Sequence, residues 1–132
     1  MIDIPRFVAE LQTWQGVPSR HQGRSRAGID CAGLVLAGLH EQGVETDAPA
    51  NYHRSAAASV LLATLAASPL LEQRSGEPEA GDLLVFRIRR EPQHLGIALG
   101  AGRMIHVPPD GVSIVTIGPL WRKRLVWRYG WR

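Results

Sequence analysis

The only cysteine of the chain, Cys31, stands where a helix is expected to begin. It follows Asp30 in the segment Gly28–Val35, which starts as a loop and ends in apolar residues. The N-terminus of a helix lowers the pKa of a thiol, and a first-turn N–H is free to donate to a developing oxyanion. Cys31 is therefore a candidate nucleophile. A small buried core residue is the alternative, because that is what a lone cysteine most often is.

A thiol nucleophile needs a base from another element, and His94 is the best candidate. It opens a run in which alternation places His94, Gly96 and Ala98 on one face of a strand and larger apolar residues on the other. We expect the apolar face to pack in the core and the slim face to lie against the helix that starts at Cys31. The remaining histidines are expected at the surface: His21, His40 and His53.

His106 lies on the next expected strand, where it could orient the imidazole of His94 as the third group of a triad does. A histidine satisfied within the sheet is the alternative. If the loop between the strands has two residues, His106 stands opposite Ile97 and points away from His94. If the loop is Gly100–Gly102, His106 stands opposite Gly96, on the same face as the base. We expect this three-residue loop, since its last glycine can adopt a positive φ.

The elements that must position these residues change character along the chain. Helical periodicity and capping residues predict helices in the first half, and short runs between Gly, Pro and Asp predict strands in the second. Helices followed by strands favour an α+β fold with helices against an antiparallel sheet. We expect a single domain over residues 1–132. The expected helices begin after Asp3, at Asp30 and near Ser55 (to Ser68), and the expected strands are Leu83–Ile88, Leu95–Leu99, Met104–Val107, Val112–Ile117 and Arg122–Trp131.

Composition excludes several other classes of protein. A single cysteine forms no internal disulfide and no cysteine cluster for zinc, and we expect neither a metal nor a cofactor. No apolar run reaches the roughly 18 residues of a membrane span. The first residues, Met1–Arg6, do not resemble a secretory signal, so we expect synthesis in the cytoplasm. The net charge of +3 is too small to indicate a nucleic-acid-binding protein.

Four segments, in order along the chain, resemble the NlpC-type cell-wall peptidases: Asp30–Val35, Gly81–Phe86, His94–Gly100 and Ile105–Val107. With the glycine- and proline-bearing loop Gly16–Gly23, the resemblance covers most of the chain. It implies a papain-like α+β fold, with N-terminal helices packed on a five- or six-stranded antiparallel sheet. It also implies cysteine endopeptidase activity on peptidoglycan stem peptides, typically after D-glutamate. In this resemblance Cys31 is the nucleophile, His94 the base and His106 the orienting residue.

Two departures from the family pattern concern substrate recognition. Ser19 stands where the family usually has a tyrosine near the oxyanion and the substrate, and Ala32 stands where it usually has a serine. The resemblance implies Ser19 and Asp30 as substrate-binding residues. The compact chain looks most like the versions found in phage and prophage tail-assembly clusters. This implies phage tail-tip proteins as partners, and a phage particle that carries the enzyme to the cell wall.

Two other functions remain open. The first is a catalytically weak or inactive tail-tip or adaptor protein with the same fold, which the two departures favour. The second is a nucleic-acid-binding module, because aromatic residues alternate with basic ones along Trp121–Arg132. An amphipathic strand with an aromatic core face and a solvated arginine face is the simpler explanation, so we expect no specific nucleic-acid partner.

Overall fold

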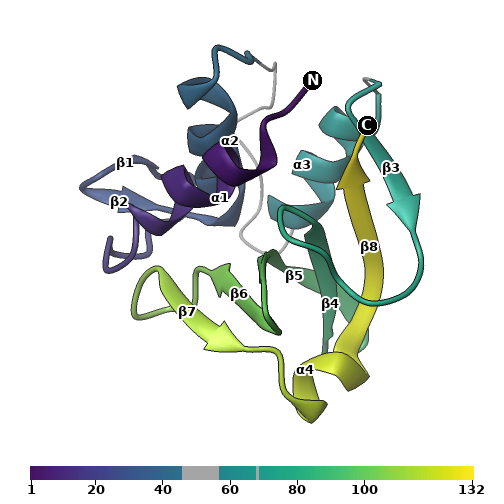
Figure 1. The fold of residues 1–132 in the computed structure, drawn as a ribbon. Coiled ribbons are helices and arrows are strands. Elements are labelled where there is room, and N and C mark those ends of the chain that lie inside the picture. The colour runs from purple at the N-terminus through teal and green to yellow at the C-terminus, as the bar shows by residue number, and fades with distance from the viewer. Residues whose placement is uncertain (46–56, 68) are drawn as a thin grey trace.

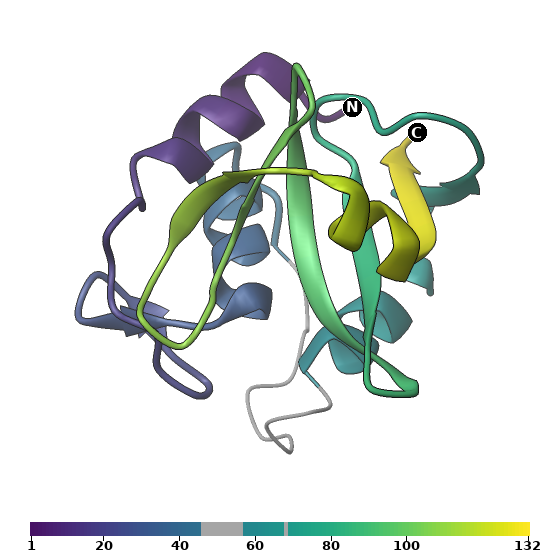
Figure 2. The ribbon, with the colours of Figure 1, turned by 90° about the horizontal axis from the view of Figure 1, so that it is seen from below.

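The computed structural model describes residues 1–45, 57–67 and 69–132, and the side chains of residues 57–59, 65 and 91–93 lie outside that description. Within these ranges the helices are α1 (Ile4–Gln12), α2 (Cys31–Glu41), α3 (Ala57–Ala66) and α4 (Pro119–Arg124). Figures 1 and 2 show α1 and α2 on one side of the molecule and α4 on the far side. None of the described helices is long and apolar enough to cross a membrane.

The main sheet of the described residues has six strands in the order β3-β8-β4-β5-β6-β7, with every neighbouring pair antiparallel. The α+β fold expected from the sequence is therefore confirmed. A small second sheet is formed by β1 (Arg24–Ser25) and β2 (Gly28–Ile29). The six strands of the main sheet are β3 (Leu71–Arg74), β4 (Leu83–Ile88), β5 (Glu91–Gly100), β6 (Arg103–His106), β7 (Ser113–Thr116) and β8 (Leu125–Trp131).

Two aspartates determine where the first two helices begin. The carboxylate of Asp3 accepts a hydrogen bond from the N–H of Arg6 at 3.1 Å, at the start of α1. Asp30 caps α2 in the same way and accepts from the N–H of Gly33 at 2.8 Å. Such caps satisfy N–H groups that have no partner inside the helix, which is why both starts are predictable from sequence.

Four elements are absent from the sequence-based prediction: the short strands β1 and β2, the strand β3 and the helix α4. The helix α4 begins at Pro119, because proline at the first helical position favours a helix, and it includes the first three residues of the strand expected over Arg122–Trp131. The strand β8 therefore begins only at Leu125. Three residues named in the prediction lie outside the described residues: His53, Ser55 and Ser68.

The main sheet carries an apolar cluster on each face. The larger cluster includes residues of α1, α2 and α3 and takes Ile97 and Ile105 from the strands. The smaller cluster includes partly buried residues around α4 and takes Ala98 and Met104. Gly96 belongs to this second face, since a Cβ at Gly96 would lie 2.6 Å from Sδ of Met104. The slim face of β5 is therefore the face that α4 covers.

The helix that begins at Cys31 does not cover this slim face, so the packing expected from the sequence is wrong. The small residues of α2 make other close contacts. A Cβ at Gly33 would collide with the carbonyl oxygen of Gly23, and one at Gly38 would lie 2.5 Å from the ring of Phe7. The slim surface of α2 is thus used against the preceding loop and against α1.

The β5–β6 hairpin places His106 opposite Gly96, as expected, but the loop differs from the prediction. The loop has two residues, Ala101 and Gly102, with φ values of 55° and 72°. One extra residue, Leu99, is unpaired in β5 and forms a β-bulge, which shifts the pairing by one residue. The predicted register is confirmed, and the predicted three-residue loop is wrong.

A buried ion pair joins β8 to the start of β4. The Nε of Arg128 donates to the carboxylate of Asp82, and both side chains are buried. The Nη1 of Arg128 donates to the carbonyl oxygen of Ser75 at 2.6 Å. The predicted strand with arginines in solvent and aromatic residues in the core is therefore wrong at two positions, because Arg128 is buried and Trp127 is 38% exposed.

Replacing Gly96 by leucine should destabilise the protein by about 1–3 kcal/mol, because the side chain has no room beside Met104 and Phe86. Gly96→Ala is the matched control, since one methyl group requires only that the flexible Met104 side chain shift. Chemical denaturation of the three proteins gives the free energy of unfolding. A Gly96→Leu protein as stable as the wild type would contradict the packing described for this face.

Candidate active site

Cys31 is the first residue of α2, and the carboxylate of Asp30 holds the surrounding segments in place. This carboxylate accepts from the N–H of Gly33 at 2.8 Å and from the N–H of Gln22 at 3.1 Å. It also pairs with the guanidinium of Arg24 at 2.8 Å. One carboxylate thus ties the preceding loop to the first turn of the helix, which fixes the position of the thiol.

The groups around the thiol act on its pKa in opposite directions. Burial raises the pKa of Cys31 to about 12, and the negative charge of Asp30 adds to the rise. The backbone N–H groups of Ala32 and Cys31, at the start of α2, lower the pKa, and so does the charge of Arg24. The effect of burial is larger than that of the helix N-terminus, so the net shift disfavours the thiolate form of Cys31.

Two histidines meet on the face of the sheet that α4 covers. The Nε2 of His94, on β5, lies 2.8 Å from Nδ1 of His106, on β6, so one of these two nitrogens donates a hydrogen bond to the other. The pairing of His106 with Gly96 makes His94 its diagonal neighbour on the same face, within reach of an imidazole. Because Nε2 of His94 is used in this contact, its Nδ1 is the nitrogen left for another group.

Trp121, on α4, covers both histidines. This residue was not predicted to belong to the site. Its indole stacks on His94, with ring centroids 5.3 Å and planes 25° apart, and meets His106 edge-on at 5.4 Å. Phe86, on β4, contacts the indole at 4.9 Å. The signal for this arrangement was the helix start at Pro119, which places Trp121 on a helix rather than on a strand.

Burial keeps both imidazoles unprotonated at neutral pH. It lowers the pKa of His94 to about 4, and the neighbouring His106 adds to the decrease. Burial also lowers the pKa of His106, against the opposite effect of Asp110. The Nε2 of His106 is buried and has no hydrogen-bond partner among the described residues. His94 is therefore available as a proton acceptor over the whole neutral range.

Cys31 and the two histidines lie beside different apolar clusters. Cys31 packs against the larger cluster together with the helices, whereas His94 and His106 lie on the α4 face. The elements α2 and β5 contact each other. In the described part of the chain no hydrogen bond joins Cys31 to either histidine. The pairing of Cys31 with His94 stays a prediction.

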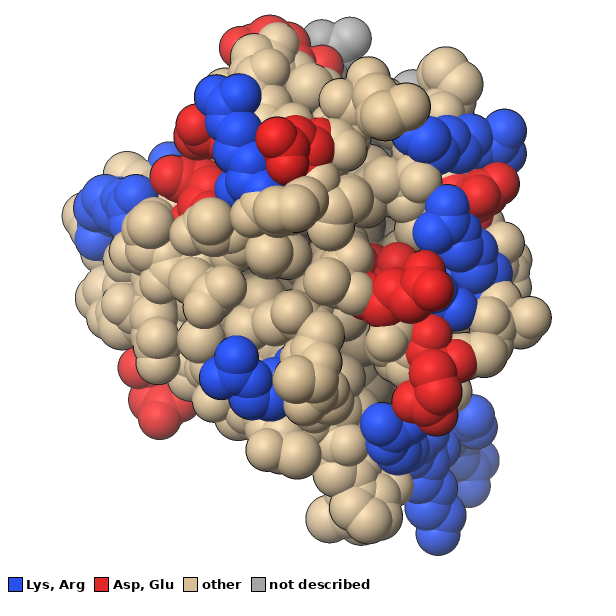
Figure 3. All heavy atoms as spheres, viewed as in Figure 1, with Lys and Arg blue, Asp and Glu red and all other residues tan. Residues whose placement is uncertain are grey.

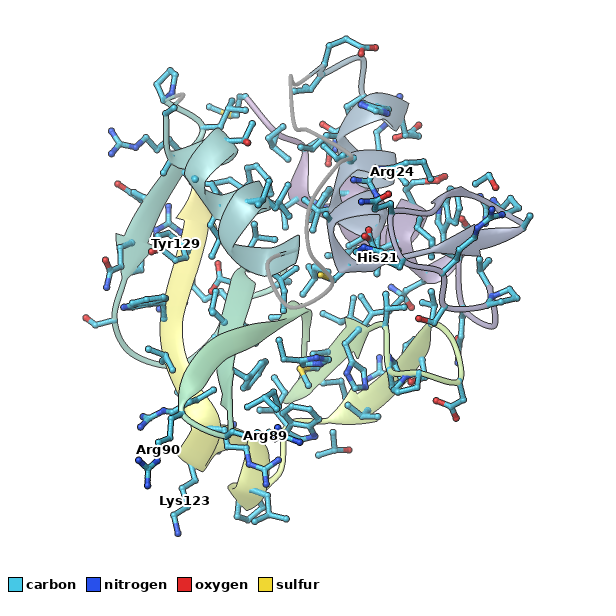
Figure 4. The ribbon with its side chains drawn as sticks, turned by 180° about the vertical axis from the view of Figure 1, so that it is seen from behind. His21, Arg24, Arg89, Arg90, Lys123 and Tyr129 are labelled. Carbon is cyan, nitrogen blue, oxygen red and sulfur yellow. The ribbon has the colours of Figure 1, made fainter. Side chains whose placement is uncertain are left out.

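The remaining residues considered in the sequence analysis are Ser19, His21 and His40. Ser19 is exposed and forms a β-bridge with Ile29. His40 is exposed, and His21 lies beside the start of α2 (Figure 4). Within residues 1–45, 57–67 and 69–132, no group of three His, Cys, Asp or Glu side chains could hold a metal ion. Substrate binding by Ser19 and Asp30 stays a prediction.

The lowered pKa of His94 makes stability depend on pH. Between its ordinary pKa of 6.5 and about 4, His94 binds a proton in the unfolded chain but not in the folded protein. The free energy of unfolding therefore falls as the pH falls through this window, by up to about 3 kcal/mol. His94→Gln lacks this term, so its deficit relative to the wild type should shrink on acidification. Denaturant titrations from about pH 7 to about pH 4 measure it, and a constant deficit would contradict the prediction.

Trp121→Ala should raise the pKa of His94 toward 6.5, because the indole stacks on the imidazole and its removal exposes the ring to water. Trp121→Phe should raise it less, since phenylalanine keeps an aromatic ring on the imidazole. An NMR titration of the histidine ring protons measures the pKa in each variant. Trp127→Ala is the matched control, because Trp127 is half-exposed on β8 and should leave the titration unchanged. Equal pKa values in all variants would contradict the proposed role of the indole.

Solved structures show which proteins share this fold. The NlpC/p60 domain of the peptidoglycan hydrolase SagA superposes with a TM-score of 0.68 at 23% identity, covering 98% of this chain and 99% of that domain. RipD of Mycobacterium tuberculosis, described as a non-catalytic NlpC/p60 domain protein adapted to peptidoglycan binding, superposes with a TM-score of 0.64 at 16% identity, covering 96% of this chain and 94% of that one. At these identities the similarity shows the fold alone.

A sequence relative is the murein DD-endopeptidase MepS, also named murein LD-carboxypeptidase, of Escherichia coli strain K12. The two sequences are 30% identical over an alignment of 122 residues, and the alignment covers 90% of this chain and 58% of MepS. The chain thus spans little more than half the length of this relative. The sequence model of the NlpC/P60 family matches residues 16–129, a range that includes Cys31, His94 and His106. The predicted resemblance is confirmed: this chain belongs to the NlpC/P60 family.

Proposed function

We propose that this protein is a cysteine peptidase that hydrolyses amide bonds in peptidoglycan stem peptides. Membership of the NlpC/P60 family supports the substrate class, since MepS is named a murein endopeptidase and SagA a peptidoglycan hydrolase. The observation that carries the chemistry is the 2.8 Å contact between Nε2 of His94 and Nδ1 of His106. It leaves Nδ1 of His94 to accept the proton of Cys31, the thiol at the start of α2.

The position of one proton decides whether His94 can act as the base. When Nε2 of His94 carries the proton and donates it to His106, Nδ1 of His94 has a free lone pair. The pKa of about 4 favours this unprotonated state at neutral pH. With Cys31 also neutral, the resting pair is a thiol and an imidazole rather than an ion pair. Proton transfer then accompanies attack of the sulfur on the carbonyl carbon.

The thiol and the base have to meet in the substrate complex, where catalytic hydrogen bonds often shorten relative to the free enzyme. The sulfur of Cys31 attacks the amide carbonyl while its proton moves to His94. The backbone N–H groups at the start of α2, which already act on the sulfur, are placed to donate to the oxyanion. The amine then leaves with the proton from His94, and water hydrolyses the thioester.

The wider setting of the activity rests on the sequence resemblance alone. We keep the phage or prophage tail, with tail-tip proteins as partners, as part of the hypothesis, although none of the relatives named above is described as a phage protein. A single domain over residues 1–132 is likewise a proposal, since the family model matches residues 16–129. Because this chain spans 58% of MepS, the proposal takes from MepS only the class of activity, which is hydrolysis of murein peptides.

A second candidate function is peptidoglycan binding without catalysis. Two observations favour it: the raised pKa of Cys31, which opposes thiolate formation, and the non-catalytic relative RipD with the same fold. Ser19 and Ala32, where the family usually has tyrosine and serine, point in the same direction. The two functions differ in one measurable respect, because only the peptidase releases new peptide fragments.

Incubation with defined muropeptides should give products for the wild type and none for Cys31→Ala, because the alanine variant lacks the nucleophile. Mass spectrometry of the mixtures identifies the products and the bond that is cut. Product that persists with Cys31→Ala would contradict the assignment of the nucleophile. Wild-type protein that binds peptidoglycan in a pull-down and yields no product would support the second candidate.

Variants of His106 serve as matched controls in the same assay. His106→Asn should keep more activity than His106→Ala, because the amide oxygen can still accept a hydrogen bond from Nε2 of His94. The difference should appear mainly in kcat, since His106 is proposed to orient the base rather than to bind substrate. Equal activity of the two variants would mean that His106 is not an orienting residue.

A further inference from the structure

We propose that the end of the molecule formed by α4 and the β4–β5 turn binds an anionic lipid surface, independently of any peptidase activity. Figure 4 shows Arg89, Arg90 and Lys123 together at this end, away from His21 and Arg24. In Figure 3, Lys and Arg side chains gather at the lower edge of the molecule, near α4. The cationic end consists of six exposed residues: Arg87, Arg89, Arg90, Arg122, Lys123 and Arg124.

The cationic end accounts for the net positive charge of the chain. It holds six of the fifteen Lys and Arg residues, and the nine others are outnumbered by twelve Asp and Glu residues. Among the described side chains, its one ion pair joins Arg122 to Glu77 at 2.8 Å. A concentration of cations at one end gives the molecule a directed field, which attracts and orients it toward an anionic surface.

The backbone at the tip of the turn favours a residue other than arginine. Arg89 and Arg90 form a two-residue turn between β4 and β5, and Arg89 has a φ of 59°. Positive φ in such turns favours glycine, asparagine or aspartate, and it strains other residues. An arginine in this conformation lowers stability, and strain of this kind is concentrated at functional positions. The tip therefore presents an arginine where the fold alone would favour another residue.

An exposed leucine next to these cations favours a lipid over a soluble anion. Leu120 is 71% exposed on α4. Lys123 and Arg124 follow it by three and four residues, so the three side chains share one face of the helix. At a membrane interface an apolar side chain enters the acyl boundary while neighbouring cations meet the phosphate groups.

Nucleic acid is the other polyanion that arginines and aromatic residues could bind, and the aromatic residues of this region are unsuited to it. Base stacking requires exposed ring faces. The indole of Trp121 is stacked on His94. Trp131 is buried, and its Nε1 donates to the carbonyl oxygen of Gly81 at 2.7 Å. Among the described tryptophans of this segment, Trp127 is the exposed one, at 38%.

Sedimentation with phospholipid vesicles tests the proposal. Wild-type protein should bind vesicles that are roughly one third phosphatidylglycerol and not vesicles of phosphatidylcholine. The double variant Arg90→Gln/Lys123→Gln should bind about 30-fold more weakly, at about fivefold per charge. The matched control Arg20→Gln/Arg103→Gln removes two exposed arginines outside the cationic end and should bind like the wild type. Leu120→Ser should weaken binding several-fold, with the larger effect at high salt.

Two further measurements separate the proposal from its alternatives. Arg89→Asn should bind vesicles more weakly while its melting temperature stays equal or rises, because asparagine relieves the strained turn. Binding to a DNA fragment without binding to anionic vesicles would overturn the proposal. Equal vesicle binding by Arg90→Gln/Lys123→Gln and by the control Arg20→Gln/Arg103→Gln would overturn it as well.

Discussion

The register of β5 against β6 is the constraint on which the candidate site depends. A shift of one residue turns every side chain of a strand to the other face of the sheet. With His106 opposite Gly96, its imidazole meets that of His94; with His106 opposite Ile97, it would enter the larger apolar cluster. The unpaired Leu99 provides the shift. A single bulged residue thus decides whether the two imidazoles meet.

Burial has opposite consequences for the two halves of the site. It makes His94 a persistent acceptor, because the imidazole stays unprotonated in the neutral range. It also raises the pKa of Cys31, because the N–H groups at the start of α2 do not compensate for the lost solvation of a thiolate. In the free protein, burial thus favours the uncharged forms of both Cys31 and His94. In the proposed peptidase mechanism, proton transfer from Cys31 to His94 therefore accompanies attack on the carbonyl and does not precede substrate binding.

The sequence predicts what is encoded locally. The caps Asp3 and Asp30 and the bounds of β4 are read directly from short segments. The pairing of His106 with Gly96 was also predicted, but from a three-residue loop, whereas the structure reaches it with a two-residue loop and the bulge at Leu99. Contacts between distant segments escape such reasoning. Arg128 looks like a solvated arginine of an alternating strand until Asp82, 46 residues earlier, is placed beside it. The role of Trp121 escapes for the same reason, because its partners lie on β4, β5 and β6.

The place of β8 in the sheet has a consequence for the order in which the fold forms during synthesis. This strand, residues 125–131, lies between β3 and β4, so an interior strand of the sheet is made after all five of the others. Pairing of such distant segments is slow. While the ribosome still holds residues 119–131, β3 has no neighbour, and Trp121 cannot cover His94. The histidine pair becomes shielded from water only after this segment has left the ribosome.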